Sequence, residues 1–218
     1  STHPEIFEWI DTNLVVPGDG KGANHVRQAG RLLLWNNMQT IHDAIHDTII
    51  SLVSGSGDVI EFTVYLLTGI SGGTGSGTFL DMAYLIRSIM QEIGGKVATS
   101  KLYGYFFRPD INNSYLSTDR DEKTTNNRNA YAALQELDYN LGLYSIGERF
   151  DILYPNNKRI TAGIEPQGLF DMVHIVSALA RNGTPLDNAS HRANRAIAQN
   201  ILSFVSNATI TFDEATGQ

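Results

Sequence analysis

A glycine-rich run carries the residue types in this chain that are best suited to bind a ligand. It reads Ser71, Gly72, Gly73, Thr74, Gly75, Ser76, Gly77, Thr78. An apolar, β-branched segment at 59–68 precedes it, and apolar residues at helical spacing follow from Phe79 to Ile93. A helix that begins at such a junction offers unpaired backbone amides and the positive end of its dipole. Because glycines let an anion approach the backbone closely, we predict that this run binds phosphate.

The neighbouring residues distinguish between kinds of phosphate loop. A Walker-type loop needs a lysine after its last glycine, but Thr78 follows Gly77 and residues 70–95 contain no lysine. A dinucleotide-binding fingerprint needs a glycine where Thr78 stands, and an acidic residue about 20 positions further on. Near that position the sequence offers Glu92 between Gln91 and Ile93, so this match is poor.

The run resembles the signature GGGTGSG of the tubulin and FtsZ family of GTP-binding filament proteins, with Ser71 in place of the first glycine. A second segment, GKGAN at 20–24 followed by Gly30 and Arg31, resembles the FtsZ segment GAGAN followed by GR. In that family this segment wraps the terminal phosphate and precedes the signature by one helix and one strand, as it does here. Asn24 can also cap the helix expected after it.

Later segments follow the family order. The strand end containing Arg108 and Pro109 resembles the FtsZ strand end TRP, and Arg128 resembles an arginine that reaches toward the terminal phosphate. Asn156 is similar to an asparagine that touches the sugar or base. Asn194 falls where the family pairs with the guanine edge, although Ser190 stands where a stacking aromatic is usual. Each residue also has an ordinary interpretation, as a solvated charge, a turn or an exposed helix position.

The resemblance implies a protein that binds GTP with Mg²⁺ and couples hydrolysis to self-association into protofilaments. It assigns nucleotide binding to Gly20, Gly22, Ala23, Asn24, Ser71, Gly72, Gly73, Thr74, Gly75, Ser76, Gly77, Arg108, Pro109, Arg128, Asn156 and Asn194. In the family, acids on a loop after the long central helix complete the active site of the neighbouring subunit. Here only Asp213 and Glu214 lie beyond that helix, and they match the pattern poorly. No protein ligand for a metal is assigned.

Two other functions stay open at this point. The first is a non-hydrolysing scaffold of the same fold that depends on nucleotide, and the second is a dinucleotide or zinc enzyme with unrelated glycine loops. His42-Asp43-Ala44-Ile45-His46 is close to the zinc motif HExxH, with both histidines one helical turn apart. Both histidines fall beside the apolar line of their helix, so we expect them to be solvated.

The alternation of strands and helices predicts an α/β domain with a mostly parallel sheet and helices on both faces, of the Rossmann-like tubulin and FtsZ type. The expected strands are 59–68, 101–107 and 150–154, and the expected helices are 24–53, 79–93, 131–141 and 186–205. Residues 114–129 are expected to form a loop and 156–167 an irregular stretch. Nucleotide would lie at the carboxyl ends of the strands.

Composition bounds the class of protein. The chain has 218 residues, of which 42% are hydrophobic, which suits one domain over 1–218. The net charge of −7 argues against nucleic acid as the main partner. The chain contains no cysteine and no apolar run long enough for a membrane span, and we expect a cytoplasmic protein. The resemblance covers 17–205 and lacks the family's first glycine loop, so we expect the domain to be incomplete at its N-terminus.

Overall fold

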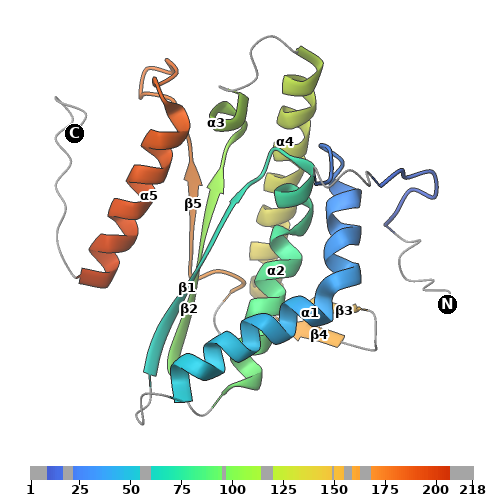
Figure 1. Cartoon of the computed structure of the whole chain (residues 1–218), viewed down its shortest axis with the longest axis vertical. Helices are drawn as coiled ribbons and strands as arrows, with labels where there is room; N and C mark the ends of the chain where they lie inside the picture. The colour runs from blue at the N-terminus through green and yellow to red at the C-terminus, as the bar shows by residue number, and fades with distance from the viewer. Residues whose placement is uncertain are drawn as a thin grey trace.

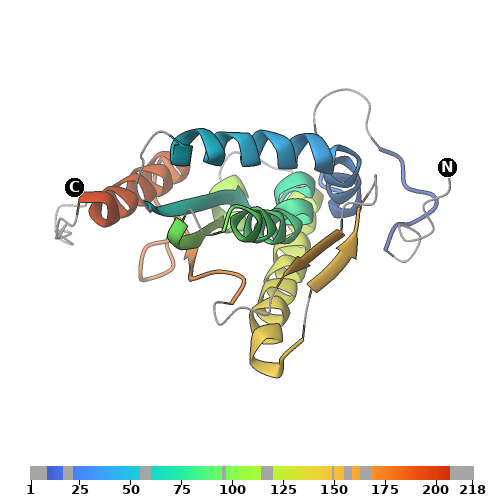
Figure 2. The ribbon, with the colours of Figure 1, turned by 90° about the horizontal axis from the view of Figure 1, so that it is seen from below.

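The computed structural model describes residues 9–16, 22–54, 60–94, 97–113, 120–148, 150–154, 159–162 and 168–206. Its elements are α1 Arg27–Ser54, β1 Ile60–Gly69, α2 Gly73–Glu92, β2 Val97–Phe107, α3 Pro109–Asn113, α4 Arg120–Leu143, the 3₁₀ turn η2 Tyr144–Ile146, β3 Phe150–Leu153, β4 Arg159–Ala162, β5 Met172–Val176 and α5 Ala189–Ser206. The predicted α/β fold is confirmed, with α5 on one side of a sheet and α1, α2 and α4 on the other (Figures 1 and 2).

The main sheet has the order β1-β2-β5, and both pairs of neighbouring strands are parallel. Side chains of β2 alternate between its two faces, as they must in a strand. Leu102 and Phe106 join the core beneath α2, whereas Tyr103 and Tyr105 pack with Ile197 of α5. The sheet therefore separates two apolar clusters, one for each layer of helices.

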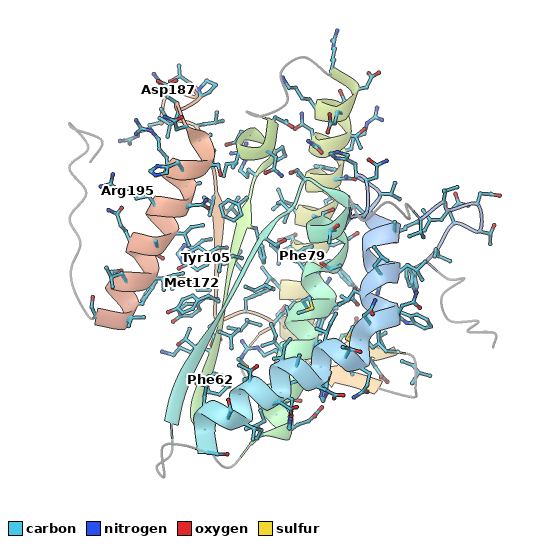
Figure 3. All side chains as sticks on the ribbon, in the orientation of Figure 1. Phe62, Phe79, Tyr105, Met172, Asp187 and Arg195 are labelled. Atoms are coloured by element: carbon cyan, nitrogen blue, oxygen red, sulfur yellow. The ribbon has the colours of Figure 1, made fainter. Side chains whose placement is uncertain are left out.

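Helix α2 is the buried centre of the molecule. The ring of Phe79 on this helix lies edge-on to Phe106 of β2, with 5.1 Å between ring centroids, and both side chains are buried. Figure 3 shows Phe79 between α2 and the sheet and Tyr105 between the sheet and α5. Leu85 and Ile89 of the same helix are also buried. Because the core holds the helix along its length, it also fixes the position of the first turn of α2.

The predicted strand at 150–154 exists, but it does not join the parallel sheet. It is β3, which pairs antiparallel with β4 in a separate sheet, with Ile152 opposite Ile160. Part of the stretch expected to be irregular is therefore a strand. Buried Tyr154 and Ile160 belong to the core cluster that includes α2, and this burial explains why the pair lies there.

Other elements also differ from the predictions. Helix α1 begins at Arg27 rather than at residue 24, and α4 begins at Arg120, inside the expected loop. Asp121 and Glu122 stand in the first turn of α4, where acidic side chains favour a helix start. Strand β5 was not predicted because its five residues are too short for a clear pattern. Among the described residues, no helix is long and apolar enough to cross a bilayer.

Candidate nucleotide-binding site

The first turn of α2 begins directly after the carboxyl end of β1. Gly72 is the N-cap residue, with extended backbone angles (φ −83°, ψ 175°), and no side chain caps the helix. The first amides of a helix have no partner within it, so those of Gly72 to Gly75 remain available to a ligand. The amides of Ser76 and Gly77 are already used inside the helix. Of the amides at 72–77, which were expected to bind phosphate, only those of residues 72–75 are therefore free to do so.

Three glycines of the run serve packing rather than access for an anion. A Cβ added to Gly73 would lie 2.5 Å from the nitrogen of Val26, and one added to Gly77 would lie 2.2 Å from the carbonyl oxygen of Arg27. A Cβ at Gly75 would meet Gly69. At Gly72, by contrast, an added Cβ would meet nothing within 4 Å. Open space for a ligand is thus found at Gly72, and the other glycines let α2 pack closely.

The second glycine-containing segment lies against this turn. The amide of Ala23 donates to the hydroxyl of Thr74 across 3.3 Å, and a Cβ at Gly22 would lie 3.2 Å from the same oxygen. Gly22 has φ +83°, which a glycine adopts freely. Residues 22–25 and the first turn of α2 are therefore neighbours, and both belong to segments that were expected to bind phosphate.

Asn24 does not cap α1, contrary to expectation. Its φ of +44° lies in the left-handed region, whereas an N-cap residue has an extended backbone, and the helix begins three residues later. The turn at 23–26 is closed instead by the amide of Val26, which donates to the carbonyl of Ala23 at 2.8 Å. The side chain of Asn24 is exposed.

Asparagines from two helices hold Ser71, which is fully buried. Asn112 of α3 donates to the Ser71 hydroxyl at 2.5 Å, and Asn129 of α4 donates to the Ser71 carbonyl at 3.0 Å. Asn129 also donates to the carbonyl of His25 at 2.8 Å, so it joins both glycine-containing segments. Neither asparagine was predicted, because 114–129 was expected to form a loop and no motif marks Asn112 just before it.

Arg108 and Pro109 lie at the carboxyl end of β2, as predicted. Arg108 is exposed, and its Nε lies 3.3 Å from Oδ1 of Asp110. Pro109 begins α3, a position that suits its missing amide proton. Asp110 accepts hydrogen bonds from the Ser177 hydroxyl at 3.0 Å and the Ala178 amide at 2.6 Å. These contacts fix the end of β2 beside the end of β5.

The remaining predicted residues are placed only in part. Arg128 is exposed on α4 next to Asn129, and Asn194 is exposed on α5. In the structure, no hydrogen bond or ion pair joins either of these two described side chains to the first turn of α2. Gly20, Asn156, Asp213 and Glu214 lie outside the described residues.

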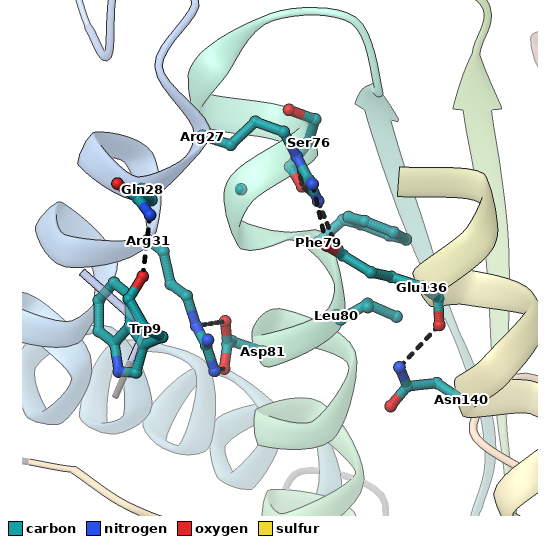
Figure 4. Close-up of a pocket in the computed structure, with 11 residues that line it drawn as sticks. Trp9, Arg27, Gln28, Arg31, Ser76, Phe79, Leu80, Asp81, Glu136 and Asn140 are labelled. Carbon is teal, nitrogen blue, oxygen red and sulfur yellow. Dashed lines mark hydrogen bonds and ion pairs between the residues drawn. The ribbon is translucent and has the colours of Figure 1, made fainter. Parts of the chain in front are cut away.

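A cavity of about 390 Å³ lies on another side of α2, between α1 and α4 (Figure 4). In its wall Arg31 pairs with Asp81 at 3.0 Å and stacks on the ring of Trp9. Asp81 also accepts a hydrogen bond from Tyr154. Burial, with the charge of Asp81 beside it, raises the pKa of Tyr154 far above its usual range. Asp81 thus ties α2 to Arg31 of α1 and to Tyr154, which directly follows β3.

Of the two histidines on α1, His42 is not solvated as expected, whereas His46 is partly exposed. His42 is buried, and its two ring nitrogens lie 2.9 Å from Asp43 and 3.0 Å from Glu92, while His46 stacks on its ring. The carboxylate of Glu92 compensates for burying a polar ring on this flank. Within the described ranges, no group of three or more His, Cys, Asp or Glu side chains is arranged to hold a metal ion.

The sequence model of the family described as "Tubulin like" matches residues 1–216. No curated protein matches the chain. Among solved structures, it is similar to CetZ from Methanosaeta thermophila strain DSM 6194, with 20% identity and a TM-score of 0.46, over 94% of this chain and 41% of that one. The chain thus spans about two fifths of the length of that protein. Because the family match extends over nearly every residue, the chain belongs to the family of tubulin-like proteins.

Proposed function

We propose that this chain is the nucleotide-binding part of a protein that binds GTP with Mg²⁺ and hydrolyses it when it assembles into filaments. The observation that carries the proposal is the uncapped first turn of α2 at the carboxyl end of a parallel strand, with open space at Gly72. Residues 22–25 lie against that turn. Membership of the tubulin-like family adds support for a nucleotide as the ligand.

The arrangement suits phosphate without a Walker lysine. The amides of Gly72 to Gly75 and the dipole of α2 would offset the charge of the phosphates, because oriented donors at a helix start attract anions. Ala23 and Asn24 would approach the terminal phosphate from the adjoining segment. Mg²⁺ would add positive charge to the phosphate oxygens. This ion would be held largely by phosphate oxygens and water.

Base recognition and hydrolysis are proposed from the resemblance. Asn156 and Asn194 would pair with the guanine edge through their amide groups. Asp213 and Glu214 would act on nucleotide held by a neighbouring copy. A cytoplasmic protein that self-associates into protofilaments fits this mechanism. A non-hydrolysing scaffold is the second candidate, and measuring turnover against protein concentration separates the two.

The binding site is tested by Gly72→Leu in the complete protein. The new side chain would fill open space next to the free amides without meeting other protein atoms, so we expect GTP affinity to fall at least about tenfold while the melting temperature stays the same. The matched control is Gly142→Leu, which adds the same side chain at a position on α4 that is equally open. Equal GTP affinity in both variants would overturn the proposed site.

A further inference from the structure

One face of α4 carries three polar residues directed at the proposed site. Glu122, Asn126 and Asn129 are spaced by four and then three positions, which places them along one line of the helix. Each makes a hydrogen bond or ion pair with His25, and Asn129 bonds to Ser71 as well. A single stripe of α4 therefore contacts both segments that would surround the phosphates.

The imidazole of His25 is held at both nitrogens. Its Nδ1 lies 2.7 Å from Oδ1 of Asn126, and its Nε2 lies 2.8 Å from Oε1 of Glu122. Asn126 donates its own amide to Asn113 at 2.9 Å, which leaves its oxygen to accept from His25. The carboxylate of Glu122 can only accept. Helix α4 therefore holds the ring of His25 at both of its nitrogens.

His25 also occupies a strained position. Its φ is +61°, and the preceding Asn24 has a φ of +44°. Residues other than glycine rarely adopt this left-handed region twice in succession. Such a conformation persists when surrounding contacts impose it. Here the contacts come from α4, through the ring of His25 and through Asn129 at its carbonyl.

We propose that Glu122, Asn126 and Asn129 are positioning residues that hold segment 22–25 in the shape that receives the terminal phosphate, with His25 as the residue through which they act. The proposal rests on the proposed function. It adds a direction: loss of the contacts of His25 lowers affinity for GTP, which carries the terminal phosphate, and leaves affinity for GDP unchanged. GDP would keep its contacts with the free amides at the first turn of α2.

The contacts of segment 22–25 support this direction. On α4, the groups that contact His25 are Glu122, Asn126 and Asn129. Asn113 of α3 supports the side chain of Asn126. On α2, the contact of the segment is the hydroxyl of Thr74, which accepts from the amide of Ala23 and does not involve the ring of His25. Loss of that ring therefore weakens the link to α4 and leaves the link to α2 in place.

The experiment measures GTP and GDP affinity of the complete protein for wild type and for His25→Asn. Asparagine tolerates the left-handed backbone and removes the imidazole. Since the contacts of the ring are lost, we expect GTP affinity to fall at least about fivefold. GDP affinity should stay at the wild-type value, because GDP lacks the phosphate that segment 22–25 would receive.

Glu122→Ala removes one of the two contacts of the ring, so it should lower GTP affinity less than His25→Asn does and leave GDP affinity unchanged. Asp138→Asn removes one charge from an exposed position of α4 and should behave as wild type with both nucleotides. Equal GTP affinity in wild type and His25→Asn, or an equal loss of GTP and GDP affinity in the variant, would overturn this proposal while leaving the nucleotide site in place. Absence of GTP binding by wild type would instead overturn the proposed function.

Discussion

The carbonyl oxygen of Gly69 lies so close to Gly75 that a Cβ built on Gly75 would be 2.1 Å from it. Gly69 ends β1 and Gly75 stands in the first turn of α2. The absence of a side chain at Gly75 is therefore what lets the helix start fold directly over the end of the strand. The role of Gly75 is thus to place the free amides of α2. The glycine at this position is explained by packing alone, without a ligand.

Gly75→Ala should consequently destabilise the protein by about 1–3 kcal/mol, because the added methyl group overpacks the junction. Gly142→Ala makes the same change at an open position on α4 and should stabilise it by about 0.5–1 kcal/mol, since alanine favours a helix more than glycine does. Denaturant unfolding of both variants gives the two free energies. Stabilisation by both changes would contradict the packing role of Gly75.

The strand before the glycine run and the helix after it could be predicted from the sequence, because an apolar strand followed by an apolar helix leaves a strong pattern. It could not separate a packing glycine such as Gly75 from an open one such as Gly72, since both have the same side chain. That difference depends on which backbone atoms lie opposite each residue, and these come from β1 and from residues 26–27.

Base choice is the second point to test. We expect GTP to displace a bound fluorescent nucleotide better than ATP does, because an asparagine amide can pair with the guanine edge. Asn194→Asp replaces the amide donor with an acceptor and should reduce the preference for GTP. Asn36→Asp, at an exposed position of α1, is the control. Equal displacement by ATP and GTP in the wild type would mean that Asn194 does not select the base.

Hydrolysis provides a third prediction. If each subunit supplies part of the active site of the next, the specific activity of the complete protein should rise with its concentration. Turnover measured across a dilution series, with light scattering to follow assembly, tests this expectation. A constant specific activity without assembly at any concentration would favour the non-hydrolysing scaffold.

His174 on β5 predicts how stability depends on pH. Its ring stacks on Tyr105, its Nε2 is buried without a hydrogen-bond partner among the described residues, and burial lowers the pKa of His174 below its ordinary value of 6.5. As the pH falls below 6.5, the unfolded chain takes up this proton before the folded one does. The free energy of unfolding should therefore decrease as the pH falls below that value.

His174→Phe keeps an aromatic ring but cannot titrate, so the variant should lose this part of the pH dependence. His191→Phe changes an exposed histidine of α5 and should keep the wild-type dependence. Denaturant unfolding at several pH values provides the measurement. Parallel curves for wild type and His174→Phe would contradict the assigned cause.

The start of α4 shows why part of the site was not predictable. Asn126 and Asn129 are polar residues in a polar stretch, which is typical of a loop, yet Asn126 is buried because Asn113 and His25 satisfy its side chain. The pairing of β3 with β4 was missed for a related reason. Which strand lies beside another depends on contacts distant in the sequence, whereas periodicity reports only the local segment.

The central claim is that nucleotide binds at the free amides of α2, and amide NMR of the protein labelled at glycine tests it most directly. On addition of GTP and Mg²⁺, the resonances of Gly72, Gly73 and Gly75 should shift, while those of Gly142, Gly147 and Gly183 should not. GTP binding that leaves the first three resonances unchanged would contradict the account.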